Sequence, residues 1–109
     1  MDYSDLNRTL VHELVHAVDS CRLKADWSDV KQHACTEIRA SSLSSECSFG
    51  VEMARGNIQM RGGWEACVKR RAKMSVGMHG IKEAEQAVED VFDRCSRDTY
   101  PFMRHPGAV

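Results

Sequence analysis

The stretch SDLNRTLVHELVHAVDSCR, residues 4–22, decides the fold of this chain. Apolar side chains recur in it at steps of three and four residues, which is the period of a helix with one apolar face. The positions concerned are Leu6, Leu10, Leu14, Ala17 and Val18. Ser4 is suited to cap the helix N-terminus. We therefore predict a helix from Ser4 to about Arg22 that packs through this apolar face.

Two histidines of this helix, His12 and His16, are four residues apart and so lie about one turn apart on the same face. Both imidazoles can reach one ion, and HExxH on a helix is typical of zinc peptidases. Glu13 is rotated by about 100° from His12, which places it to act as a general base rather than as a ligand. We predict one Zn²⁺ per chain, with Glu13 as the catalytic base. The alternative is a helix that carries two unrelated histidines.

A catalytic zinc needs a third protein ligand. Metzincins place a histidine six residues after the second one, but Arg22 occupies that position here. Glu37 is the expected ligand, because a glutamate on a second, antiparallel helix gives the His₂Glu set of thermolysin. Asp26, in the segment between the two helices, is the alternative.

Two further side chains are candidates for supporting roles. Asp19 follows His16 by three residues and could accept the far N–H of a ligand histidine. His33 lies one turn before Glu37 on the same face and could donate to the transition state. For His33 the alternative is a half-exposed histidine without a role, and for Asp19 a helix-end carboxylate without one.

The rest of the chain also reads as helical. We expect Ser28 or Asp29 to cap a second helix, whose apolar positions are Val30, Ala34, Ile38 and Leu43. Ser41–Ser48 is serine-rich and is predicted to be a loop, followed by a short helix over residues 49–54.

Two more helices are expected after the glycines at positions 62 and 63. Trp64–Met78 should form a helix with Trp64, Cys67, Val68, Met74 and Met78 on one side. After a turn at Gly80, Ile81–Ser96 should bury a stripe made of Ala84, Ala87, Val88, Val91, Phe92 and Cys95. No segment predicts a strand, so the fold class is mostly α, with a C-terminal helical hairpin.

Length and composition agree with one helical domain over residues 1–99. Residues 100–109 contain two prolines and a glycine and are expected to be a loose tail. The formal net charge of -1 gives no electrostatic reason to expect a nucleic-acid surface. No run of sequence approaches the ~20 apolar residues of a membrane span.

Several spaced blocks of the chain resemble one family: HELVHAVDSCR at 12–22, DW at 26–27, HACTEIRA at 33–40, LSSECS at 43–48, CVKRRA at 67–72, VFDRC at 91–95 and PF at 101–102. This is the family of mitochondrial inner-membrane metalloproteases that also act in ATP synthase assembly. The resemblance covers most of the chain, which makes it much more specific than the zinc motif.

The resemblance implies a zinc metalloendopeptidase attached peripherally to the mitochondrial inner membrane, on the intermembrane-space side. It implies that the substrate is a mitochondrially encoded subunit of the ATP synthase membrane sector, whose assembly the protein also assists. The alternatives are a non-proteolytic assembly factor that keeps the zinc site and an inactive truncated homologue. The family has a further N-terminal region, and zincins align substrates on strands upstream of the active-site helix. We therefore expect this chain to be the C-terminal part of a larger catalytic domain.

The five cysteines are dispersed and form no CxxC pair. This favours a disulfide framework in an oxidising compartment, as the resemblance also implies. An odd count leaves one thiol without a partner in the chain. Cys67 and Cys95 should lie near the open end of the helical hairpin and could form a disulfide; the alternative is two small apolar residues in its seam. Cys21, Cys35 and Cys47 stay unassigned.

Overall fold

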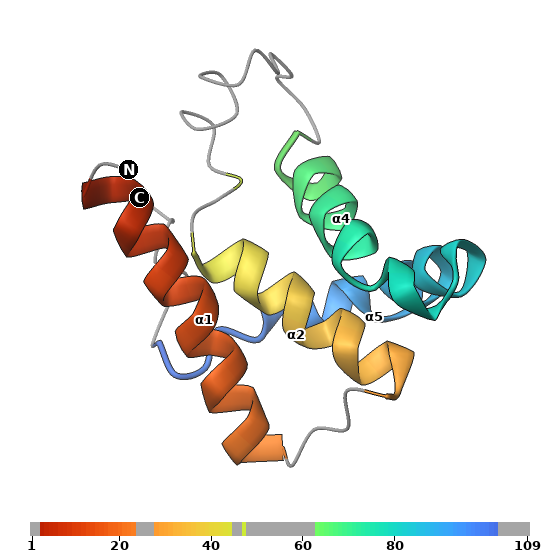
Figure 1. Ribbon diagram of the computed structural model, residues 1–109, viewed down its shortest axis with the longest axis horizontal. Coiled ribbons are helices and arrows are strands. Elements are labelled where there is room, and N and C mark those ends of the chain that lie inside the picture. Colours follow the sequence, from red (N-terminus) through yellow and green to blue (C-terminus); the bar gives the residue numbers. More distant parts are fainter. Residues whose placement is uncertain (1–2, 24–27, 45–46, 48–62, 103–109) are drawn as a thin grey trace.

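Helix α2 (Val30–Leu43) is the centre of the fold and contacts α1 (Tyr3–Leu23), α4 (Gly63–Ser75) and α5 (Ile81–Arg97). In the computed structural model, which describes residues 3–23, 28–44, 47 and 63–102, α1 and α4 lie on either side of α2 (Figure 1). α5 passes behind α2 in this view. The described residues contain helices and no strand, which confirms the predicted mostly α fold.

The starts of the first two helices follow different local rules. α1 begins at Tyr3, so Ser4 lies inside the first turn instead of capping it. Asp29 caps α2, because its side chain accepts the backbone N–H of Lys31 at 2.9 Å and that of Gln32 at 3.3 Å. This contact selects one of the two predicted caps, and it satisfies N–H groups that have no partner within the helix.

The face that α1 buries is not the predicted one. Leu6, Leu10 and Leu14 are 45%, 59% and 51% exposed, whereas Val15 and Asp19 are buried. α1 lies at the edge of the molecule and packs chiefly on α2, so only one narrow face of it is covered (Figure 1). Val15 fills that contact with Ala40, Leu43 and the partly buried Val11 and Phe102.

The serine-rich loop predicted from Ser41 begins later than expected. α2 continues to Leu43, and both Ser41 and Ser42 are buried in its last turn. The turn closes where the Ser44 N–H donates to the carbonyl of Ala40 at 3.1 Å. Burial against the core therefore outweighs the modest helix propensity of serine.

The helix predicted over Trp64–Met78 ends early, at Ser75. A 3₁₀ turn, η1 (Gly77–His79), follows it, and the Gly80 N–H donates to the carbonyl of Gly77 at 3.0 Å. Gly77 weakens the continuing helix, because glycine loses more backbone freedom there than any other residue. Gly80 has a φ of 111°, which few other residues adopt, and this fits the predicted turn into α5.

The main core lies between α2, α4 and α5. All six predicted core positions of α5 are buried, which confirms that stripe. On α4 the expected apolar side is only partly correct. Trp64, Met74 and Met78 are exposed, while the buried positions are Cys67, Val68 and Ala72.

Two disulfides join the helices and their flanks. Cys35 on α2 bonds Cys95 on α5 with a Cα–Cα distance of 5.4 Å, and Cys47 bonds Cys67 with one of 5.7 Å. The predicted Cys67–Cys95 bond is therefore wrong. α5 packs more closely on α2 than on α4, which brings Cys95 to Cys35. Cys21 is the free and exposed cysteine.

The start of the predicted tail is held on the fold. The Phe102 N–H donates to the carbonyl of Thr99 at 2.8 Å, and the Phe102 ring packs against the Val15 cluster. Residues 103–109, the helix expected over 49–54 and Asp26 lie outside the described residues. None of the helices in the described ranges combines the length and the apolar character that crossing a bilayer requires.

Candidate metal centre

Three side chains from two helices converge at one point. His12 and His16 come from α1, and Glu37 comes from α2. The Nε2 atoms of the two histidines are 3.2 Å apart. Glu37 places Oε1 at 3.4 Å from His16 Nε2 and Oε2 at 3.8 Å from His12 Nε2. The structure therefore brings together both histidines of the HExxH motif and the glutamate preferred as third ligand.

This donor set fits a zinc ion. Ligand atoms at 2.0–2.1 Å from a tetrahedral zinc are about 3.3 Å from one another. The His12–His16 and His16–Glu37 separations of 3.2 and 3.4 Å are near that value, and the His12–Glu37 separation of 3.8 Å, to the other carboxylate oxygen, is longer. Glu37 Oε2 is buried and accepts no hydrogen bond from the described residues. A buried carboxylate oxygen without a donor is costly, and a cation at this point would satisfy it.

The imidazole of His16 is kept in the form that can bind a metal. Burial lowers the pKa of His16, and the neighbouring His12 lowers it further, against the opposing charges of Glu37, Glu13 and Asp19. Because protonation is disfavoured, the ring keeps a free electron pair for a ligand bond.

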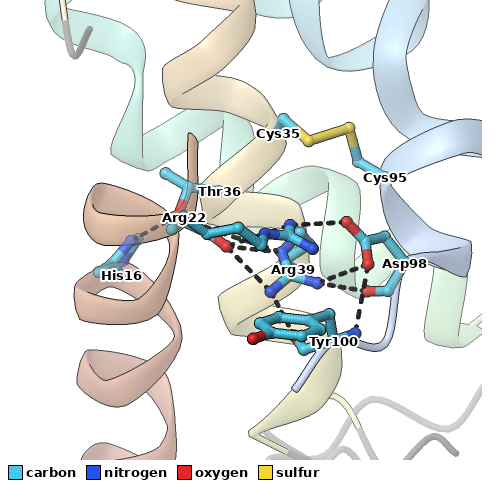
Figure 2. A network of polar contacts seen from close by, with 9 residues as sticks. His16, Arg22, Cys35, Thr36, Arg39, Cys95, Asp98 and Tyr100 are labelled. Carbon is cyan, nitrogen blue, oxygen red and sulfur yellow. Dashed lines mark hydrogen bonds and ion pairs between the residues drawn. A yellow bond between two sulfur atoms is a disulfide. The ribbon is translucent and has the colours of Figure 1, made fainter. Parts of the chain in front are cut away.

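A hydroxyl group connects His16 to Asp19. His16 Nδ1 is 3.0 Å from Thr36 Oγ1, and the Thr36 hydroxyl donates to Asp19 Oδ2 at 2.8 Å (Figure 2). Asp19 thus reaches His16 through Thr36, and not by the direct contact with a ligand histidine that the sequence predicted. Thr36 is 3% exposed and Asp19 is 1% exposed, so this chain of contacts is shielded from water.

Asp19 in turn lies against a buried arginine. Arg39 has no exposed surface, and its Nε donates to both oxygens of Asp19, at 3.1 and 3.0 Å. Its Nη1 donates to the carbonyl of Asp98 at 2.6 Å, and its Nη2 donates to the carbonyl of Tyr100 (Figure 2). Arg22 donates to the Asp98 carboxylate at 2.8 Å and lies over the Tyr100 ring.

An open cleft adjoins the three converging side chains. Its volume is about 550 Å³, and the residues that line it are Glu13, His16, Ala17, Ser20, His33, Thr36, Glu37 and Met78. Glu13 is exposed in this cleft and not part of the His12–His16–Glu37 cluster. A carboxylate that faces the cleft next to the ligands is where a general base for hydrolysis has to be.

His33 also lines the cleft, beside the third ligand. Its Nε2 is 3.5 Å from Glu37 Oε1, and its Nδ1 is 3.1 Å from Nε2 of His79 on η1. The two rings meet edge to face, with centroids 5.4 Å apart. His33 is thus held by a second histidine, and its Nε2 faces the ligand cluster.

Three contributors had no signal of their own in the sequence. The only hint for Thr36 is its position directly before Glu37, the predicted third ligand. Arg39 and His79 reach the site through contacts 20 and 46 residues apart in the chain, and no spacing rule predicts such pairs.

Comparison with known proteins supports the same reading. The chain matches the peptidase M76 family over residues 1–103. It is 52% identical to the mitochondrial inner membrane protease ATP23 of Vanderwaltozyma polyspora over 103 residues, which are 89% of this chain and 41% of that protein. It is 45% identical to the Danio rerio homologue over 105 residues, with 93% and 41% covered.

The chain covers only part of the length of these relatives. It spans less than half of the length of either protein. No solved structure matches the chain. The family match covers nearly all of the sequence and includes every residue of the metal centre. This chain belongs to the peptidase M76 family.

Proposed function

We propose that this chain provides the metal centre of a zinc-dependent endopeptidase. The observation that carries the proposal is the convergence of His12, His16 and Glu37 beside a cleft that exposes Glu13. Two imidazoles and one carboxylate leave one position of a tetrahedral zinc open, as catalytic sites require. Asp26 remains the alternative third ligand; Glu37 is favoured because its Oε2 is buried and accepts no hydrogen bond from any residue that the structure describes.

The side chains around the cleft have distinct tasks in this proposal. His12, His16 and Glu37 hold the ion, which when bound supplies Lewis-acid polarisation. Glu13 takes the proton of the attacking water and passes it to the amine that leaves. His33 donates from Nε2 to the oxygen of the peptide carbonyl as negative charge develops there. Asp19 keeps His16 oriented through its contact with Thr36.

The proposal also includes a location and a substrate for the whole protein. Relatives carry the name of a mitochondrial inner membrane protease, so we place the whole protein at that membrane, attached peripherally. The two disulfides support its intermembrane-space side, because that compartment must allow thiol oxidation. From the resemblance, the substrate is a mitochondrially encoded subunit of the ATP synthase membrane sector, and the protein assists assembly of that sector.

The variant Glu13→Gln tests the proposal in the whole protein. It should abolish cleavage of the subunit precursor while zinc content, measured by atomic absorption, stays at one ion per chain. Glu85→Gln changes an exposed glutamate of α5 and should leave cleavage unchanged. Cleavage by the Glu13→Gln protein would remove Glu13 as the base.

The same variant separates proteolysis from assembly. In cells that lack the native protein, ATP synthase assembly restored by Glu13→Gln would show that the assembly role needs no cleavage. Loss of both would show that processing is the essential step.

A further inference from the structure

We infer that Thr36 is a positioning residue, which fixes the tautomer and orientation of His16 through a buried relay from His16 to Thr36, Asp19 and Arg39. The inference rests on the proposed function, because it assigns a role in holding the metal ligand. Thr36 belongs to no motif of metal ligands or bases, and its role emerges only from its contacts in the fold.

The proton count along the relay determines the tautomer. A threonine hydroxyl has one proton, and an ionised carboxylate can only accept. Because the Thr36 hydroxyl donates to Asp19 Oδ2 at 2.8 Å, its oxygen must accept from His16 Nδ1 at 3.0 Å. A proton on Nδ1 leaves Nε2 of the neutral ring without one. Nε2 is the atom that lies 3.2 Å from His12 Nε2 and 3.4 Å from Glu37 Oε1.

The far end of the relay is fixed by charge. Arg39 pairs with Asp19 through Nε and also through Nη2, which lies 2.9 Å from Oδ1. A guanidinium that donates along two of its edges has little freedom to turn. It therefore holds the Asp19 carboxylate in place, including the oxygen that accepts from Thr36.

The C-terminal end of α5 supports the same point. Carbonyls of Asp98 and Tyr100 accept from Arg39, and the Cys35–Cys95 disulfide ties α2 to α5 one residue before Thr36 (Figure 2). The segment after α5 is thereby connected to the metal ligand on α1. In a site shielded from water, each contact strengthens the next and restricts the ring.

Thr36→Val removes the hydroxyl and keeps the shape of the side chain. Zinc affinity, measured by competition with a chromophoric chelator, should fall about 10–100-fold, the usual cost of losing a partner of a metal-binding histidine. Thr36→Ser restores a hydroxyl and should bind zinc close to the wild-type affinity. Ser75→Ala removes an exposed hydroxyl from α4, which contributes no residue to the relay, and as the control it should not change the affinity. Equal zinc affinity of Thr36→Val and wild type would overturn the inference.

A second measurement works without metal and keeps the test decisive if Thr36→Val fails to fold. Nitrogen-15 NMR of the histidine rings in the metal-free wild-type protein should show His16 protonated at Nδ1 and not at Nε2. A predominant Nε2–H form of His16 would overturn the inference. If the Nδ1–H form is found but the wild-type protein binds no zinc, the proposed function fails while the relay stands.

Discussion

Arg39 is the side chain that holds the buried polar network together. It is fully buried and satisfies Asp19 together with two backbone carbonyls. A guanidinium offers five N–H donors in one plane, and no other side chain can serve three acceptors in this arrangement. Its removal leaves the buried Asp19 carboxylate with Arg22, at 3.4 Å, as its remaining charge partner among the described residues, so most of the compensation for burying that charge is lost.

Arg39→Met should lower the free energy of unfolding by about 3–5 kcal/mol, the usual loss when one member of a buried ion pair is removed. Urea denaturation followed by circular dichroism measures this difference. Arg94→Met, which alters an exposed arginine of the last turn of α5, is the control and should change stability by less than about 0.5 kcal/mol. Similar losses in the two variants would show that the buried network does not stabilise the fold.

Asp98 makes the network sensitive to acid. Burial alone would raise the pKa of Asp98, but the hydrogen bonds from Arg22 and from the Tyr100 N–H, with the charge of Arg39, lower it below the ordinary value of 3.8. A carboxyl group with a lowered pKa in the folded state stabilises the fold above about pH 3.8, and that contribution is lost as the pH falls through the folded value.

Asp98→Asn should therefore reduce the stability at pH 7, and the difference from wild type should shrink below pH 3.8. Thermal unfolding across a pH series measures this difference. Asp93→Asn, which changes an exposed residue of α5, should show no such trend. A difference that stays constant with pH would contradict the role given to the Asp98 carboxylate.

For single residues, the sequence predicted those contacts that follow from regular helical spacing. His12 and His16 could be paired because their spacing is one helical turn. Glu37 could be added because a second, antiparallel helix was expected to bring it back to them. Thr36 and Arg39 were not predicted, because their partners on α1 are 17 and 20 residues away and depend on how two helices pack. For Asp19 the sequence predicted a direct contact with a ligand histidine, and the Thr36 hydroxyl that lies between Asp19 and His16 is visible only in the fold.

Among the elements, α2 decides the packing, since it contacts each of the other α-helices in the described part of the chain. Ile38 of α2 is fully buried in the main core, whereas Ile81 of α5 is 74% exposed. Ile38→Ala should destabilise the protein by about 2–5 kcal/mol through lost burial and the cavity left behind. Ile81→Ala makes the same chemical change at the surface and should cost less than about 0.5 kcal/mol in a urea titration. Equal effects would contradict the assignment of the core to α2.

The disulfides fix how these elements are joined. Peptide mapping without reduction should link Cys35 to Cys95 and Cys47 to Cys67, and alkylation should label Cys21 alone. In the chain-entropy model, closing 60- and 20-residue separations stabilises the fold by about 4 and about 3 kcal/mol. Serine pairs at each bridge should lose stability in that order. A Cys67–Cys95 peptide in the map would contradict the packing of α5 on α2.

Helix boundaries and helix faces differ in how well the sequence predicts them. The stripe of α5 was correct, because a helix covered along its length shows its burial in its own pattern. The leucines of α1 were predicted to be buried but are exposed. A helix at the edge of the molecule buries only one narrow face, and its sequence does not say which face that is. The Cys67–Cys95 disulfide prediction failed because α5 contacts both α2 and α4, and its sequence alone does not say which helix lies closer.

For the whole molecule, the fold explains why the site lies where it does. In the proposed function α1 supplies two ligands and the base and α2 supplies the third ligand, while α5 with the segment after it supports the network behind them. The Arg39 network reaches the cleft through Asp19 and Thr36, and Thr36 itself lines the cleft, so the buried polar network and the cleft are in direct contact. The mostly α class and the family were accessible from the sequence; the arrangement of helices around α2 was not.

The central claim is that His12, His16 and Glu37 hold one zinc ion. A competitive zinc titration of the wild type, Glu37→Gln and Asp26→Asn tests it most directly. We expect one ion per chain, an affinity reduced by more than about 100-fold in Glu37→Gln, which exceeds the cost of losing a supporting contact, and no change in Asp26→Asn. Unchanged affinity in Glu37→Gln together with a loss in Asp26→Asn would contradict it.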